Sequence, residues 1–296
     1  MKQLYEMVNI SKQGHLSFID RHSKEEQDNM LILSAIAGLR VLHPQMGAKK
    51  MYELLRPENI GRDKFITFAV ANGYGVQRIR SFRKTTNASK IYKYQNLING
   101  LVVYDINNVW VSDITYFELG DTFYYLTFIE DVYSRRIIGS IAYPTLQAKA
   151  NLYALNIALK TRGISSYQSL IHHSDRGVQY TSNEYVKVLE SRNIKISMCS
   201  SVYENAFVER VNGIIKNEYL NHWTINDYPS LKQKLKLAVY LYNNERPHWN
   251  LGKMTPLSFE NYIKELPIEQ RKGLQMYTID NEEKDLINVN QLCLFD

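Results

Sequence analysis

The sequence lacks the features of a secreted or membrane-spanning protein. Its 296 residues include only two cysteines, Cys199 and Cys293, which lie far apart and without metal-ligand spacing. Such sparse cysteine argues against a disulfide framework and is typical of a reducing compartment. No apolar run approaches the roughly 18 residues that span a bilayer, and the opening stretch "MKQLYEMVNISKQGHLSF" has no secretory h-region. We therefore expect a cytoplasmic protein that does not enter a membrane.

Acidic residues are scarce in one region of the chain. The whole chain carries a formal net charge of +6, but residues 48–93 alone hold eleven Lys or Arg against three acidic residues. A local excess of +8 favours a polyanionic partner such as DNA.

Helical patterns precede and overlap the first part of this basic region. We expect helices within 25–44, 47–57 and 60–73, with Gly73 as the C-cap of the third. Short helices separated by turns are typical of a helix-turn-helix module. The basic stretch that follows would contact DNA phosphates through Arg78, Arg80, Arg83 and Lys84. The alternative interpretation is a solvated basic linker.

The middle of the chain alternates between strand and helix patterns. Strands are expected at 108–118, 122–131, 135–144, 169–174 and 194–199. The expected helices are 145–163, with Thr145 as N-cap and Gly163 beyond its end, 181–193, 204–220 and 229–245. The helix at 181–193 would open with a capping box of Thr181 and Glu184. This order predicts an α/β fold, a ribonuclease-H-like mixed five-stranded sheet with flanking helices, preceded by a small all-α domain.

Three carboxylates could meet in such a sheet. Asp113 lies inside an apolar strand, Asp175 ends the fourth strand, and Glu209 lies in a following helix. Crowded carboxylates repel one another unless divalent cations neutralise them, and hard oxygen ligands suit Mg²⁺ or Mn²⁺. Two such ions about 4 Å apart can activate a hydroxyl and stabilise the leaving oxygen at phosphorus. The alternative is that each acid is separately structural.

Four motifs sharpen this choice. They are, in order, "WVSDITYF", "HSDRGVQYTS", "ENAFVERVNGIIKNE" and "YNNERPHWNLGKMTPLSF". Together they resemble the DDE transposases of bacterial insertion sequences, which have a retroviral-integrase-like catalytic core. More narrowly, they resemble the second-frame (OrfB-type) subunit of two-frame elements, and the resemblance spans about residues 30–260. It implies that Asp113, Asp175 and Glu209 form a catalytic triad that binds two Mg²⁺ or Mn²⁺ ions. It also implies DNA cleavage and strand transfer at the element ends, without a covalent protein intermediate.

Residues near Glu209 are candidates for DNA contact. Lys216 follows Glu209 by seven residues, nearly two helical turns, so the two share a helix face. A carboxylate and a lysine on one face could hold a DNA end. Arg210 and Asn212 flank that face, with solvated helix charges as the alternative interpretation.

The spacing between the second and third acids departs from the family pattern. Between Asp175 and Glu209 lie 33 residues, whereas the resemblance implies 35, and we assign the difference to a shorter loop in "CSSVYENA". Glu204 and Glu218 are alternative third carboxylates. Glu204 precedes the established helix and Glu218 is rotated by about 180° from Glu209, so Glu209 is retained.

Several neighbouring residues receive weaker assignments. His172 and His173 should point to opposite faces of a strand, which argues against a zinc site. Gly177 would let the backbone approach DNA closely. The motif "YNNERPH" places a further set near a helix end, and the resemblance implies a position near the active site without giving a role to any of them: Tyr242, Asn243, Arg246 and His248.

The last residues suggest a further partner. The peptide "QLCLFD" resembles the motif by which bacterial proteins dock onto the replication sliding clamp, with Gln291, Leu292, Leu294 and Phe295 as the contacts. The alternative is that these residues fold back onto the domain. The family resemblance also implies a homo-oligomer on DNA, association with the nucleoid and fusion to an upstream-frame protein.

These patterns divide the chain into five parts: an N-terminal segment (1–28), a helix-turn-helix domain with a basic arm (29–84), a linker (85–104), a catalytic core (105–262) and a tail (263–296). Two other functions remain open, a DNA-binding remnant or repressor without catalysis and a ribonuclease-H-like nuclease.

Overall fold

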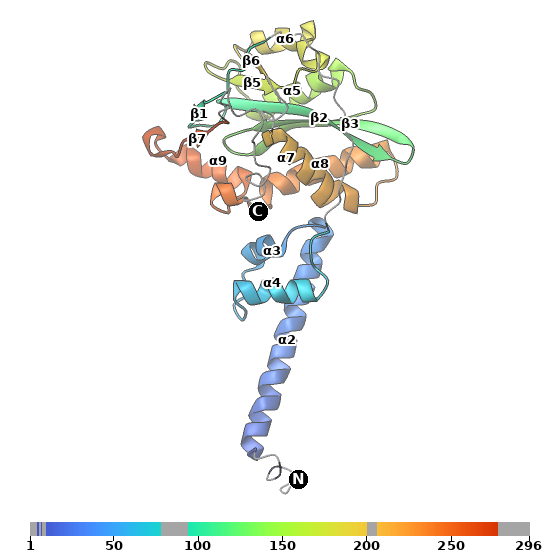
Figure 1. Ribbon diagram of the computed structural model, residues 1–296, viewed down its shortest axis with the longest axis vertical. Helices are drawn as coiled ribbons and strands as arrows, with labels where there is room; N and C mark the ends of the chain where they lie inside the picture. Colours follow the sequence, from blue (N-terminus) through green and yellow to red (C-terminus); the bar gives the residue numbers. More distant parts are fainter. Residues whose placement is uncertain (1–4, 6, 8–9, 78–93, 200–205, 278–296) are drawn as a thin grey trace, which may run out of the picture. The chain divides into compact units, whose positions relative to one another are not determined.

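The computed structural model describes residues 5, 7, 10–77, 94–199 and 206–277. It divides into two compact units, Met1–Gln77 and Arg78–Asp296 (Figure 1). None of the described helices is both long enough and apolar enough to cross a membrane. The five-part division expected from the sequence remains a prediction.

The N-terminal unit is helical. It contains α2 (Lys12–Leu42), α3 (Ala48–Leu55) and α4 (Arg62–Ala71). These helices share a small core made of Ile32, Ile36, Met46, Ala48, Met51, Phe65 and Ala69. Two expectations need correction. The helix α2 begins at Lys12, well before residue 25, and its N-cap Ser11 accepts a 3.0 Å hydrogen bond from the backbone N–H of Gly14. The C-cap of α4 is Asn72, and Gly73 follows it with a φ of 84°.

A five-stranded mixed sheet organises the second unit. Its strand order is β4-β3-β2-β5-β6, comprising β2 (Val109–Leu119), β3 (Thr122–Asp131), β4 (Arg136–Tyr143), β5 (Ile171–Ser174) and β6 (Lys195–Met198). The β2–β3 and β3–β4 pairs are antiparallel, and the β2–β5 and β5–β6 pairs are parallel. This topology confirms the predicted ribonuclease-H-like sheet, with each strand within a few residues of its expected bounds.

Helices cover both faces of the sheet (Figure 1). One face carries α5 (Ala148–Arg162) and α6 (Asn183–Glu190), and the other carries α7 (Ala206–Ile214), α8 (Tyr228–Asn244) and α9 (Pro256–Glu265). Successive side chains of β2 point to opposite faces of the sheet. Val109 and Val111 join the core beneath α7 and α8, while Trp110 joins the core beneath α5. Both faces of the central strands are therefore buried, as a covered sheet requires.

Short elements complete the unit. A two-stranded antiparallel sheet pairs β1 (Val102–Val103) with β7 (Leu274–Gln275), which the sequence patterns did not predict. The helix α7 continues as a π-helical segment, η3 (Ile215–Tyr219). The single-turn 3₁₀ helices are η1 (Val178–Thr181), η4 (Leu220–His222), η5 (Trp249–Leu251) and η6 (Ile268–Gln270).

Two predicted helix caps are wrong. The N-cap of α5 is Gln147 rather than Thr145, although Gly163 follows its end in the left-handed conformation as expected. The predicted capping box at Thr181 does not form, because Thr181 belongs to η1 and its hydroxyl donates to the carbonyl of Val178 at 3.1 Å. Ser182 is the N-cap of α6, without a side-chain cap hydrogen bond.

Candidate active site

Two of the candidate carboxylates lie on neighbouring central strands. The parallel β2–β5 pair has Ser112 opposite Ser174, so Asp113 and Asp175 occupy the next positions of the two strands. Asp175 directly follows the C-terminal end of β5, and Asp113 lies beside it within β2, which continues to Leu119. The sequence predicted this neighbourhood on the condition that the first and fourth strands adjoin, and they do.

Asp113 is in an environment that opposes its negative charge. Burial, then the charge of Asp175 and, more weakly, the charge of Glu209 raise its pKa to about 8. The backbone N–H of Ile114 and the amide of Asn212, whose Nδ2 donates to Oδ2 at 2.7 Å, only partly offset this shift. A carboxylate of this kind binds either a proton or a cation at neutral pH.

Asp175 is held by its own turn. Its Oδ1 accepts a 3.0 Å hydrogen bond from the backbone N–H of Gly177, and burial raises its pKa. A Cβ on Gly177 would come within 3.0 Å of that same oxygen and 2.8 Å of Gln179 Oε1. A side chain at this position would push the Asp175 carboxylate aside by a few tenths of an ångström, a local reason for glycine that the sequence interpretation did not contain.

The helix α7 brings the third carboxylate to the site. Glu209 lies in its first turn with an exposed side chain. Burial of part of that side chain raises the pKa of its carboxyl. One turn later Asn212 binds Asp113, and one turn beyond that Lys216 donates to Thr115 Oγ1 at 3.0 Å. Because Asp113 and Thr115 are alternate residues of β2, the two contacts fasten successive turns of the helix along one strand face.

Lys216 is already engaged within the protein. Its Nζ also donates to the carbonyl of Tyr116 at 3.3 Å and lies 5.1 Å from the centre of the Tyr116 ring. Burial lowers its pKa, while the charge of Asp113 acts in the opposite direction. Glu209 and Lys216 thus both act electrostatically on Asp113, in agreement with a shared helix side.

The three carboxylates lie close enough to interact electrostatically, but their side chains do not converge on a single metal position. Within residues 10–77, 94–199 and 206–277, no group of three His, Cys, Asp or Glu side chains is arranged to hold a metal ion. The helix α7 begins directly after residues 200–205, which lie outside the described chain. The donor chemistry nevertheless fits a hard divalent cation, since the charges of Asp175 and Glu209 raise the proton affinity of Asp113.

The alternative third carboxylates are no better placed. Glu218 forms a two-pronged ion pair with the buried Arg246, with N–O distances of 2.7 and 2.6 Å. Its two oxygens are therefore committed to a structural contact. Glu204 lies outside the described residues.

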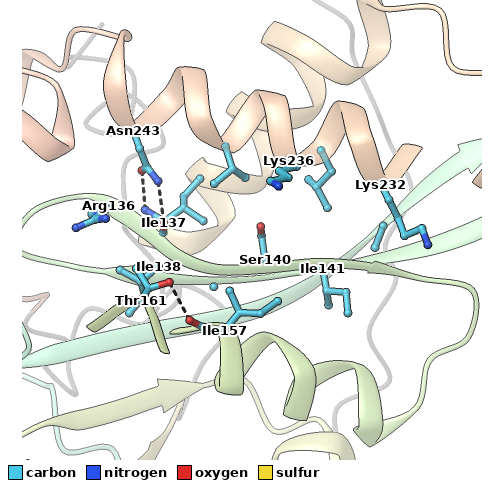
Figure 2. A pocket seen from close by; sticks show the side chains of 14 residues that line it. Arg136, Ile137, Ile138, Ser140, Ile141, Ile157, Thr161, Lys232, Lys236 and Asn243 are labelled. Atoms are coloured by element: carbon cyan, nitrogen blue, oxygen red, sulfur yellow. Dashed lines mark hydrogen bonds between the residues drawn. The ribbon is translucent and has the colours of Figure 1, made fainter. Parts of the chain in front are cut away.

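The residues of the "YNNERPH" motif have structural contacts. Arg246 ties the end of α8 to η3, and the ring of Tyr242 packs edge-on against His248 with a 4.7 Å centroid separation. Asn243 binds the edge strand β4, accepting from the N–H of Ile137 at 3.0 Å and donating to its carbonyl at 2.8 Å (Figure 2).

Beside these bonds lies a groove of about 400 Å³ between β4, α5 and α8 (Figure 2). Three cations line it, Arg136, Lys232 and Lys236, and none of the candidate carboxylates does. The groove is thus separate from the site formed by the carboxylates.

The two histidines are buried on opposite sides of the strand, as alternation predicts. His172 Nε2 meets the hydroxyl of Tyr185 at 2.9 Å, whereas His173 contacts Ser197 at 2.8 Å and Cys199 at 3.1 Å. Burial lowers the pKa of His172 to about 4 and that of His173 to about 3. Both rings are therefore neutral core residues at physiological pH.

Three residues near the site were missed or undervalued by sequence reasoning. Tyr180 is buried with its hydroxyl 3.0 Å from Ser112 Oγ, and burial followed by the charges of Asp175 and Asp113 raises its pKa. Glu130 is a buried carboxylate of β3 whose pKa burial raises to about 8, with Arg135 and Arg210 acting against that shift. Asn212 received only a flanking role. No local pattern marks these residues, since their partners lie on other elements.

The remaining candidates fall outside the described part of the chain. These are the basic arm (Arg78, Arg80, Arg83 and Lys84) and the C-terminal peptide (Gln291, Leu292, Leu294 and Phe295). Arg210, in contrast, is described and exposed on α7.

Comparison with known protein families assigns the chain to a class. Residues 104–202 and 192–256 match two family models, both described as the integrase core domain, which together cover about half of the chain. The chain belongs to the insertion-sequence transposases that carry an integrase-like core.

The chain is similar to individual proteins of insertion sequences and to a solved integrase structure. The chain is 27% identical over 264 residues to the insertion element IS600 uncharacterized 31 kDa protein of Shigella sonnei, covering 86% of this chain and 96% of that protein. It is 37% identical over 119 residues to the putative transposase for insertion sequence element IS986/IS6110 of Mycobacterium tuberculosis, covering 38% of this chain and 43% of the relative. A solved structure of the HTLV-2 integrase catalytic core domain in complex with magnesium is 22% identical, with a TM-score of 0.44, covering 56% of this chain and 99% of that one.

Proposed function

We propose that this protein binds the ends of its own insertion sequence and catalyses metal-dependent DNA strand cleavage and strand transfer. The observation that carries the proposal is the meeting of Asp113 and Asp175 on adjacent strands, with the helix of Glu209 fastened to Asp113. Membership of the transposase family supports the reaction class.

Asp113, Asp175 and Glu209 would hold two Mg²⁺ or Mn²⁺ ions. When bound, such ions polarise a phosphodiester and stabilise both the attacking and the leaving oxygen. The chain itself keeps the carboxylates in position. Gly177 fixes Asp175 through its backbone N–H, and Asn212 fixes Asp113 through its amide.

Cleavage and transfer would then be two displacements at phosphorus. Water attacks at the element end and releases a 3′ hydroxyl, and that hydroxyl attacks a phosphodiester of the target strand. Each displacement breaks one P–O bond and forms one, so no energy-supplying cofactor and no covalent protein intermediate are needed.

DNA binding is assigned to two regions. The helical N-terminal unit, with its own core, would act as a helix-turn-helix module. Arg78, Arg80, Arg83 and Lys84 would contact phosphates beside it, and Lys216 and Arg210 would contact DNA near the carboxylates. Replacing the four basic-arm residues with alanine should weaken end binding and flatten its salt dependence by up to about four phosphate contacts.

The proposal includes partners beyond DNA. We expect a homo-oligomer on DNA, fusion to an upstream-frame protein, and docking of the C-terminal peptide onto the replication sliding clamp. Deletion of residues 291–296 tests the last of these, because clamp pull-down should be lost. Undiminished pull-down by the truncated protein would rule the peptide out.

One incubation separates the proposed function from its rivals. The protein is mixed with Mg²⁺ and supercoiled donor DNA that carries the element ends. Joined ends support a transposase, nicking alone indicates a ribonuclease-H-like nuclease, and absence of product with retained DNA binding indicates a non-catalytic remnant or repressor.

A further inference from the structure

Asn212 makes a contact that its place in the sequence does not explain. It lies in α7, three residues after Glu209, with only 6% of its surface exposed. Its Nδ2 donates to Asp113 Oδ2 at 2.7 Å. One hydrogen of the amide is thus bonded to the carboxylate at the centre of the site.

The other end of the same amide is unsatisfied. Asn212 Oδ1 is buried and has no hydrogen-bond partner among the described residues. Buried polar atoms are nearly always paired, and an unpaired one costs free energy. An orphaned acceptor beside a cluster of carboxylates is the arrangement expected when a donor is supplied by something the chain does not contain.

We propose that Asn212 is a positioning residue for the metal site, holding the Asp113 carboxylate with its amide nitrogen and accepting a hydrogen bond from water in the coordination shell with its amide oxygen. This inference rests on the proposed function, because it needs a divalent cation at Asp113. Ligand-orienting neighbours of this kind typically change metal affinity about 10- to 100-fold when they are removed.

Leucine at this position separates positioning from folding. Asn212→Leu has nearly the volume of the amide but neither its donor nor its orphaned acceptor. Leucine also removes the donor to Asp113, and a buried acceptor left without its donor destabilises the folded state. The melting temperature without metal should therefore fall by a few degrees, and the positioning role is measured by the Mg²⁺ concentration dependence instead.

The chain offers a matched control on the opposite face of the sheet. Asn151 of α5 is also buried, accepts a 3.0 Å hydrogen bond from Thr127 Oγ1, and has an unpaired amide nitrogen. Asn151→Leu makes the same chemical change away from the carboxylates. It should leave the response to metal as it is in the wild type.

The experiment is a Mg²⁺ titration of the melting temperature of the full chain, with Mg²⁺ alone as the probe. For Asn212→Leu, the Mg²⁺ concentration at which the melting temperature begins to rise should be about 10- to 100-fold higher, while Asn151→Leu keeps the wild-type concentration. If Asn212→Leu does not fold, Asn212→Ala takes its place with the same expected shift.

Other outcomes would overturn the inference. An unchanged onset concentration for Mg²⁺ in the Asn212 variant removes the positioning role, and equal shifts in both variants indicate general loosening of the core. If the wild type itself does not respond to Mg²⁺, the metal site of the proposed function fails as well, so the two failures are distinguishable.

Discussion

The raised pKa of Asp113 predicts how the stability of the metal-free protein depends on pH. The reference pKa of this carboxyl is 3.8, and in the folded protein it is raised to about 8. Between these values the folded state binds more protons than the unfolded state, so the free energy of unfolding falls as pH rises through that window. Asp113→Asn removes the titrating group while keeping a side chain of the same shape.

The magnitude follows from proton linkage. One proton is worth about 1.4 kcal/mol per pH unit, so the Asp113 contribution between about pH 6 and about pH 8 is about 2 kcal/mol. For a unit of this size, that corresponds to a loss of about 4–8 °C in melting temperature. In EDTA, the melting temperature of the wild type should therefore fall by this much relative to Asp113→Asn.

Glu130→Gln is the matched control. Burial raises the pKa of Glu130 to about 8 as well, so its removal should flatten the pH dependence to a similar degree. Added Mg²⁺ should restore the part of the high-pH stability that Asp113 controls, in the wild type and in Glu130→Gln. Identical pH slopes for the wild type and Asp113→Asn, measured by scanning calorimetry, would refute the reasoning.

Three further substitutions separate the chemistry from the scaffold. Gly177→Ala should shift the Asp175 carboxylate and lower the strand-transfer rate by about 10- to 100-fold, with an unfolding free energy within about 1 kcal/mol of the wild type in urea titrations. Glu218→Gln should lower the free energy of unfolding by about 2–4 kcal/mol, because it leaves Arg246 without its counter-charge. If this variant also lost the response to Mg²⁺, Glu218 would instead be a metal ligand. Asn243→Leu should cost about 2–4 kcal/mol by stripping both hydrogen bonds from the edge strand, and urea unfolding with an unchanged midpoint would contradict that role.

Sequence reasoning succeeded where the pattern is local and repeated. The strand at Val109–Leu119 was expected one residue earlier at each end, because β-branched and aromatic residues fill it and a turn signal follows it. The opposite orientation of His172 and His173 follows from the side-chain period of two along a strand. Strand order was only a condition in the sequence interpretation, and the structure shows that the first and fourth strands do pair.

It failed where two local options compete or where no periodicity exists. Thr181 has the residue type and spacing of a capping box, but its hydroxyl bonds to Val178 within a 3₁₀ turn instead. The first half of α2 was not predicted because it contributes no residue to the core before Ile32, so no apolar stripe marks it.

Contacts between distant residues were the least accessible. The sequence placed Asn212 on the flank of the Glu209 face but gave no reason to pair it with Asp113, 99 positions away. The engagement of Glu218 by Arg246, which removes a rival third carboxylate, likewise depends on how α8 packs against η3. Such pairings are products of tertiary structure and have no local signature.

The central claim is that the three carboxylates perform chemistry rather than hold DNA. The most direct test measures strand transfer of a pre-cleaved element end into target DNA, with Mg²⁺, alongside end binding by the same proteins. Asp113→Asn, Asp175→Asn and Glu209→Gln should each bind the end with near wild-type affinity and yield no joined product. Full strand-transfer activity in any of the three variants would contradict the account.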